Sequence, residues 1–208
     1  MKHLFKIILI GIILFFAGCK KERDGGQWNL KIEDGTEVYN YRGVTYNPVT
    51  SDGTSASFTS FAGLGSSGSS FFYNTQSHFI VRLGNISRIG FDIVFTTIDS
   101  AITAALKTTN SNTIRFNAFK QVVKKGTYLF NNSTVTPFII YTDKKGTTWS
   151  TDFSQTNFLE VLSVTPNTTD NTANAIIAQI NFDIGLKDLN NTLTKRIKGS
   201  MFTFFNLN

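Results

Sequence analysis

The sequence is poor in the residues that most often build covalent scaffolds and metal centres. Its 208 residues include one cysteine, two histidines and three prolines. A lone cysteine, Cys19, excludes an internal disulfide. His3 lies in the N-terminal segment of residues 1–19, which leaves His78 as the one histidine of the remaining chain. A zinc site takes three or four His, Cys or carboxylate ligands. We therefore expect no disulfide framework, no metal and no cofactor.

Charged residues are also scarce, at 16% of the chain, and the formal net charge of +6 is spread along the sequence. No run of five or six like charges occurs. Proteins that bind nucleic acid concentrate their basic residues into a patch or stripe. We therefore expect no nucleic-acid partner.

Residues 1–19 have the layout of a secretory signal. A short basic stretch precedes an apolar run over residues 7–16 (IILIGIILFF), and Ala17-Gly18-Cys19 ends that run with two small residues and a cysteine. The apolar run is too short to cross a bilayer, which takes about 20 residues. We predict that residues 1–18 are a signal peptide.

The segment Phe16-Ala17-Gly18-Cys19 resembles the lipobox of bacterial lipoproteins, in which the cysteine is lipidated and becomes the mature N-terminus. It departs from the family at Phe16, where Leu, Val or Ile is usual. The resemblance implies a lipid on Cys19 and a membrane contact made through that lipid. The alternative is a plain signal peptide that is cut after Gly18 and leaves no anchor.

Residues 20–27 (KKERDGGQ) are charged and then glycine-rich, without apolar periodicity. We predict that residues 19–27 form a flexible tether. The segment resembles the one that follows the cysteine in surface-exported lipoproteins of Bacteroidota, although those segments are typically more acidic. The resemblance implies a place in the cell envelope, at the outer membrane, and leaves the periplasmic and surface faces both open.

The remaining composition is typical of β-strands, with 20 phenylalanines among many Thr, Ile and Val residues. From Ile176 to Ile184, apolar residues alternate with mostly polar ones, as in an antiparallel strand with one buried face. We predict that residues 28–208 form a single all-β domain, an antiparallel β-sandwich of about eight to ten strands, with a β-barrel as the alternative. The expected strands include residues 38–46, 79–81, 91–95, 121–130, 136–142, 147–151, 158–165, 173–184 and 196–205.

One segment has helical rather than strand spacing. Apolar residues recur between Ile98 and Leu106 at intervals of three and four. This spacing predicts a single short helix near 98–107, with Thr97 as its N-cap.

Residues 47–70 are rich in glycine, serine and other turn-forming residues, and we expect them to form turns and loops. Gly63, Gly65 and Gly68 match the spacing G-x-G-x-x-G. A dinucleotide site needs a helix directly after this motif. The strand-like Phe71-Phe72-Tyr73 follows instead, so we reject that site.

The C-terminal half carries a second resemblance. Gly126-Thr127-Tyr128, the turn at residues 141–146 and the terminal residues 197–202 are similar to small uncharacterised Bacteroidota lipoproteins that end in an I-x-G-x-F strand. The resemblance covers residues 115–205. It implies a β-sandwich and assigns no catalytic residue.

Aromatic side chains are the first candidates for ligand contact. Tyr39 and Tyr41 lie two residues apart in a predicted strand, so their rings share a face, and Arg42 follows them. We expect this face to be exposed and predict that the three side chains contact a glycan or peptide, with core packing as the alternative. Trp149, by contrast, is expected to lie opposite Ile140 in a hairpin and to belong to the core.

Candidates for catalysis are few. His78 would have to serve as the base of any Ser-His-Asp triad. Asp92, Asp183 and Glu160 lie in predicted strands and would be the carboxylates of a glycosidase, which needs two of them flanking the scissile bond. The nearest approach to a calcium loop is Asp170 among asparagines, and it lacks a second carboxylate.

Asp99-Ser100-Ala101 resembles the short O-glycosylation signal of Bacteroidota envelope proteins, and the resemblance marks Ser100 as the modified residue. Taken together, these features predict a lipid-anchored envelope protein that serves as a non-catalytic binding or structural module. The alternative is a hydrolase that acts on extracellular glycan or peptide.

Overall fold

The structure is a computed structural model, and it describes residues 28–43, 54–67, 70–83, 87–108, 111–130, 134–166 and 175–207. Within these ranges, only the backbone is described for residues 42–43, 54–57, 82–83 and 87–88. Cys19 and the polar segment around Asp170 also lie outside the described residues, so the lipidation and calcium hypotheses remain predictions from sequence.

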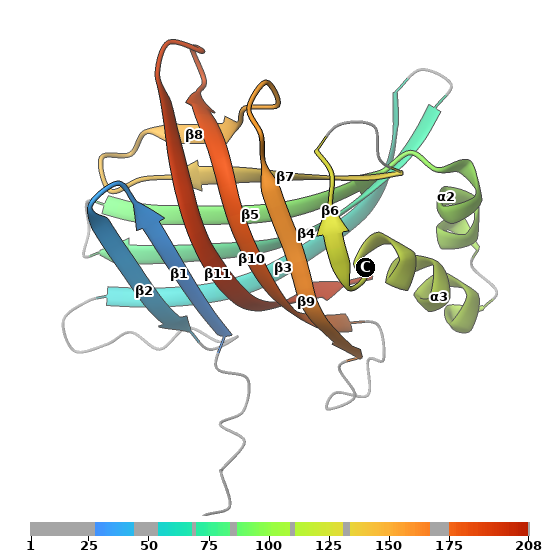
Figure 1. Ribbon diagram of the computed structural model, residues 1–208. Coiled ribbons are helices and arrows are strands. Elements are labelled where there is room, and N and C mark those ends of the chain that lie inside the picture. The colour runs from blue at the N-terminus through green and yellow to red at the C-terminus, as the bar shows by residue number, and fades with distance from the viewer. Residues whose placement is uncertain are drawn as a thin grey trace, which may run out of the picture.

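Strands account for most of the described chain. Two short helices interrupt the series, and both lie between the fifth and sixth strands. The elements, labelled as in Figure 1, are β1 (Trp28–Asp34), β2 (Glu37–Gly43), β3 (Thr54–Ser67), β4 (Ser70–Leu83), β5 (Ser87–Thr97), α2 (Ser100–Lys107), α3 (Asn112–Val122), β6 (Gly126–Tyr128), β7 (Val135–Thr142), β8 (Thr148–Thr151), β9 (Phe158–Pro166), β10 (Ala175–Asp188) and β11 (Thr194–Asn206).

All eleven strands belong to one antiparallel sheet in the order β2-β1-β11-β10-β8-β7-β5-β4-β3, with β9 pairing β10 and β6 pairing β9. The sheet curls so that β3, β4, β5, β7 and β8 cross behind the steeper β1, β2, β9, β10 and β11 (Figure 1). The predicted all-β antiparallel class is confirmed. The inner faces meet as in a sandwich, while the hydrogen-bonded sheet continues from one layer to the other as in a barrel.

The strand β10 carries the sheet from the front layer to the back layer. One of its edges pairs β11 from Ala175 to Lys187. The other edge pairs β9 as far as Asp183 and then β8 from Leu186 onward. The change of partner falls at Gly185, whose N–H donates to Asn157 Oδ1 over 2.8 Å. A Cβ atom at this residue would lie 2.2 Å from Oε1 and 2.9 Å from Cβ of Gln155, so any side chain here would displace the Gln155 side chain.

Aromatic residues from the two layers fill the space between them. Phe91 of β5 stacks on Phe182 of β10 with ring centroids 5.0 Å apart. Phe95 of β5 meets Phe205 of β11 edge-on at 5.3 Å. These rings are at most 3% exposed. The alternation predicted for Ile176–Ile184 is confirmed, because the even-numbered residues of this stretch are buried.

Hydrogen bonds also join the layers directly. The Tyr73 hydroxyl donates to the carbonyl of Leu207 over 2.9 Å, and the Thr75 hydroxyl donates to the carbonyl of Asn206 over 3.0 Å. Beside them, the hydroxyls of Ser77 and Thr203 are hydrogen-bonded to each other. The back layer is therefore held to β11 by polar contacts as well as by ring packing.

The helices cover one end of the sheet. The predicted helix is confirmed as α2, but Asp99 rather than Thr97 caps it, accepting from the N–H groups of Ala101 and Ile102 over 2.9 Å. A second helix, α3, was not predicted, and it begins after its N-cap Ser111. Of the strand expected over 121–130, only β6 forms, because α3 continues to Val122.

Two further expectations are wrong. Residues 54–67 were expected to be loop, but they form β3 and pair β4 along their whole length. The β7–β8 hairpin places Trp149 opposite Tyr141 rather than Ile140. Trp149 is nevertheless a core residue, at 7% exposed, because the shifted register turns it to the inner face beside the buried Tyr141.

Candidate functional site

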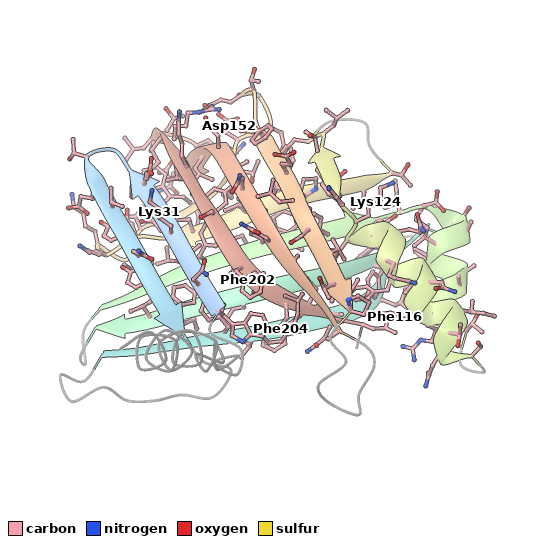
Figure 2. The ribbon with its side chains drawn as sticks, turned by 60° about the horizontal axis from the view of Figure 1, so that its bottom comes forward. Lys31, Phe116, Lys124, Asp152, Phe202 and Phe204 are labelled. Carbon is pink, nitrogen blue, oxygen red and sulfur yellow. The ribbon has the colours of Figure 1, made fainter. Side chains whose placement is uncertain are left out.

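The two outer faces of the curled sheet differ in chemistry. The front layer presents charged side chains that pair with one another. Lys31 contacts Glu33 at 2.6 Å on β1, and Asp183 of β10 lies 2.5 Å from Arg196 and 3.2 Å from Lys198. Figure 2 labels Lys31 of β1 on this layer, and it labels Phe202 and Phe204 of β11 nearer the bottom of the view. This face is typical of a solvated surface.

The outer face of the back layer carries few charges, and its apolar side chains lie among uncharged polar ones. The burial of Tyr73, Thr75, Ser77 and Phe79 turns the intervening residues of β4 outward, and their partners on β3, β5 and β7 share that side. We call this surface the apolar face. Its members include Thr59, Phe61, Phe72, Asn74, Gln76, His78, Ile80, Asp92, Val94, Phe138 and Ile140.

A shallow hollow of about 250 Å³ opens on the β3–β4 part of the apolar face. Phe61, which is 55% exposed, forms one wall, and Phe72 forms another. Asn74 and Gln76 supply the polar lining, and no residue of the hollow is charged. The complete lining is Phe61, Ala62, Gly63, Leu64, Gly65, Phe72, Asn74 and Gln76.

Two glycines of β3 shape this hollow in different ways. Gly65 lies opposite Phe72, and a Cβ atom there would lie 2.3 Å from Cζ of that ring. The Phe72 ring therefore lies against the bare backbone at Gly65. Gly63 lies opposite Asn74 and has no atom within 4 Å of the point where its Cβ would stand. The absence of a side chain at Gly63 leaves the hollow open.

His78 and Asp92 lie beside the hollow, opposite each other on β4 and β5. His78 Nδ1 and Asp92 Oδ1 are hydrogen-bonded. Thr59 is the residue opposite His78 on β3. Its hydroxyl is buried without a hydrogen-bond partner among the described residues, so it is not held by the imidazole. The row Asp92-His78-Thr59 therefore has the residue types of a triad without the hydrogen bond from nucleophile to base that such catalysis uses.

The structure places the candidate carboxylate Asp92 on a different outer face from Asp183 and Glu160. Phe91 and Phe182 stack across the core, so their neighbours Asp92 and Asp183 project from opposite outer faces of the molecule. Asp183 is paired with Arg196 and Lys198, and Glu160 lies on β9 opposite Asn181. A glycosidase pair of Asp92 with Asp183 is excluded by this arrangement.

The prediction that Tyr39 and Tyr41 form an exposed face is wrong for Tyr39, which is 8% exposed and belongs to the core. The two rings are stacked with centroids 6.1 Å apart, and Tyr41 packs on Phe79 at 5.5 Å. Burial raises the pKa of Tyr41 to about 12, with the charge of Glu37 adding to the effect. The side chain of Arg42 lies outside the described residues. This burial removes the ground for a ligand contact at Tyr39, while ligand contact by Tyr41 and Arg42 stays a prediction.

Ser100 is exposed at the first turn of α2. The preceding Asp99 uses its carboxylate to cap that helix. The aspartate of the short glycosylation signal therefore has a structural role, and the structure does not test modification of Ser100.

A second polar cluster ties three hairpins together. Lys195 of β11 lies 2.9 Å from Asp34 of β1 and 3.3 Å from Asp143 of the β7–β8 turn. Its ammonium also lies 4.2 Å from the centre of the Trp149 ring. Tyr141 donates to Asp34 over 3.0 Å, and burial, followed by the charge of Asp34, raises its pKa far above the usual value. Every member has a partner inside the cluster, so we interpret it as structural.

Comparison with known proteins gave no relative: no family model, no curated protein and no solved structure matches this chain. None of the helices in the described ranges is long and apolar enough to cross a membrane. Likewise, the described part of the chain holds no group of three or more His, Cys, Asp or Glu residues that could bind a metal ion.

Proposed function

We propose that this protein is a non-catalytic binding module of the cell envelope, held there by a lipid on Cys19, and that it binds its ligand on the apolar face. The contrast between the two outer faces of the sheet supports this proposal. A large apolar side chain that stays exposed beside a hollow with a few polar groups is typical of a ligand-binding surface. Here the charged pairs are on one face, while the hollow and the exposed Phe61 ring are on the other.

The anchor rests on the sequence of residues 1–19 and on the resemblance to lipoprotein signals. A lipidated cysteine carries several acyl chains, each of which contributes about 0.8 kcal/mol per buried CH₂ group. One chain alone holds a protein only marginally, and two or more hold it firmly. A binding module that is anchored in this way would meet its ligand at the envelope, and holding that ligand requires a binding surface but no catalytic residues.

The proposal is tested by probing a printed array of glycans and peptides with the full-length protein purified in detergent. Phe61→Ala should weaken the captured signal about tenfold or more, since it removes the most exposed ring of the hollow. Phe158→Ala is the matched control, because Phe158 is 41% exposed but lies on β9, whose partner there is the front-layer residue Asp183. The proposal fails if no ligand is captured, or if both variants bind as the parent does.

The hydrolase alternative rests on the hydrogen-bonded pair of His78 and Asp92 beside the hollow. A hydrolase that used this pair would lose turnover of a captured glycan or peptide in His78→Ala while Phe61 is intact. Product analysis by mass spectrometry after incubation of each captured ligand with parent and variant separates the two functions. A binding module leaves the ligand unchanged in both samples.

A further inference from the structure

The hollow on the apolar face is small and has no formal charge. Its volume of about 250 Å³ lies below the 300–1,000 Å³ that is usual for drug-sized ligands. No lysine or arginine lines it, so the lining offers no charged partner for a phosphate, sulfate or carboxylate group. A neutral ligand the size of a single ring fits both observations.

The walls of the hollow combine ring faces with amides. Phe61 and Phe72 offer flat apolar surfaces, while Asn74 and Gln76 each carry both donors and an acceptor. A sugar ring has apolar C–H faces and a rim of hydroxyls that both donate and accept. Asn74 Oδ1 is buried without a hydrogen-bond partner among the described residues. The amide therefore gains a hydrogen bond when its side chain turns toward a ligand hydroxyl in the hollow.

An extended peptide fits the hollow less well. Peptides bind sheets mostly by adding a strand to a free edge, where backbone groups are unpaired. The hollow opens on the outer face of β3 and β4, whereas the nearest free edge in the described sheet is the outer edge of β3. A peptide added to that edge would run beside the hollow, and a peptide lying in the hollow would contact side chains rather than unpaired backbone groups.

We infer that the hollow is a binding site for one ring of a neutral carbohydrate, with Phe61 and Phe72 against the ring and the amides of Asn74 and Gln76 on its hydroxyls. This inference rests on the proposed function, since it names the ligand class of the same site. Gly63 is the residue whose missing side chain admits the sugar.

The test uses Gly63→Val in the full-length protein. Valine suits a strand, and its Cβ meets no atom within 4 Å, so the variant should fold while its side chain fills the hollow. Calorimetric titration with cellohexaose, xylohexaose and mannohexaose should give at least one ligand that binds the parent. We expect Gly63→Val and Phe61→Ala each to weaken that binding about tenfold or more. Phe158→Ala should bind as the parent does, and thermal unfolding should show Gly63→Val to be as stable as the parent.

Each other outcome has a defined meaning. Binding of a neutral oligosaccharide that Gly63→Val leaves unchanged overturns the hollow as its site. Capture of only sulfated glycans or peptides, lost in Phe61→Ala, overturns the carbohydrate inference and leaves the proposed binding function standing. A parent that sediments as a dimer and a Phe61→Ala variant that sediments as a monomer would show that a second copy covers the face, and would overturn both proposals.

Discussion

Trp149 donates a hydrogen bond of 2.9 Å from its indole N–H to Oδ2 of Asp143, within the turn that joins β7 to β8. Oδ1 of the same carboxylate accepts from the backbone N–H groups of Lys145 and Thr147, each over 3.0 Å. Burial raises the pKa of Asp143, but the hydrogen bonds from Trp149, Thr147 and Lys195 outweigh it and leave the pKa below its usual value.

The lowered pKa of Asp143 makes the stability of the fold depend on acidity. The unfolded pKa is about 3.9, and the folded value lies below it. The stabilisation is therefore fully present above the unfolded pKa and is lost as the pH falls through the folded value. We predict that Asp143→Asn has a lower free energy of unfolding than the parent near pH 7. Urea unfolding should show the difference in free energy between the two proteins becoming smaller toward pH 3. A difference in the free energy of unfolding that stays constant with pH would contradict a stabilising role for the Asp143 charge.

Lys195 is the shared cation of Asp34 and Asp143, and all three side chains are 13–18% exposed. Removing one partner of a mostly buried ion pair leaves the other charges without compensation. We predict that Lys195→Met lowers the free energy of unfolding by about 2–3 kcal/mol, less than for a fully buried pair because some water reaches the cluster.

Lys198→Met is the control for that change. Its ammonium pairs with Asp183 at 3.2 Å, but the Lys198 side chain is 60% exposed. Exposed pairs contribute at most about 1 kcal/mol. Equal losses in the two variants, measured by chemical denaturation, would show that the Lys195 cluster does not tie the hairpins together.

Gly199 permits the close packing of β11 against β1. A Cβ atom at this residue would lie 2.0 Å from the carbonyl oxygen of Lys31 and 2.6 Å from the Phe182 ring. Because the backbone cannot move aside cheaply, we predict that Gly199→Ala lowers stability by about 1–3 kcal/mol. Gly63→Ala, which meets no atom within 4 Å, should leave the thermal unfolding temperature unchanged or slightly raised. Similar unfolding temperatures for the two variants would contradict this difference.

Tyr39 and Val38 are neighbours on β2 with opposite environments. Tyr39 is 8% exposed and Val38 is 60% exposed. We predict that Tyr39→Ala costs about 3 kcal/mol and lowers the unfolding temperature by about 6–12 °C. Val38→Ala should change stability by no more than about 0.5 kcal/mol. If Tyr39→Ala is as stable as Val38→Ala, the ring does not belong to the core and its role as a ligand contact regains support.

The lipid anchor has its own test. Cys19→Ala removes the thiol that would carry the acyl chains, so we expect a variant that is either unprocessed or released in soluble form. Membrane fractionation after an alkaline wash, with the mature size read on a gel, measures both properties. A variant that is processed to the parental size and stays with the membranes would exclude the lipobox.

Much of the fold was predictable because a strand with one buried face shows apolar residues at every second position of its sequence. β10 shows it over Ile176–Ile184, and the structure confirms the faces. β3 was not predictable by composition, since its glycines and serines disfavour strands. It forms because β4 pairs it along its whole length and because the Phe72 ring covers the backbone at Gly65. Tertiary pairing outweighs local preference there.

The helix α3 was missed for the opposite reason. Thr113, Ile114 and Phe116 favour strands by local propensity. The helix forms because Ser111 caps it and because Phe119, which is fully buried, packs edge-on against Tyr73 at 6.3 Å. Spacing of three between Phe116 and Phe119 was the available signal.

The candidate site could be predicted only in part. Hydropathy does not mark which residues of 72–79 point outward, because the inward Thr75 and Ser77 are as polar as the outward Asn74 and Gln76. The hollow could not be predicted either, because it depends on β3 lying beside β4, and residues 54–67 have the composition of a loop. The pair of His78 and Asp92 is likewise a product of register between two strands.

The pairing of β1 with β11 sets a condition on when the fold can form. Asn29 to Asp34 pair with Ile197 to Phe202, so the first and last strands of the described chain are neighbours. A ribosome has to complete almost the whole polypeptide before β1 gains this second partner, because only β2 is close to it in sequence. During synthesis β1 and β2 can therefore form at most a two-stranded hairpin, which is marginally stable in water until β11 joins it.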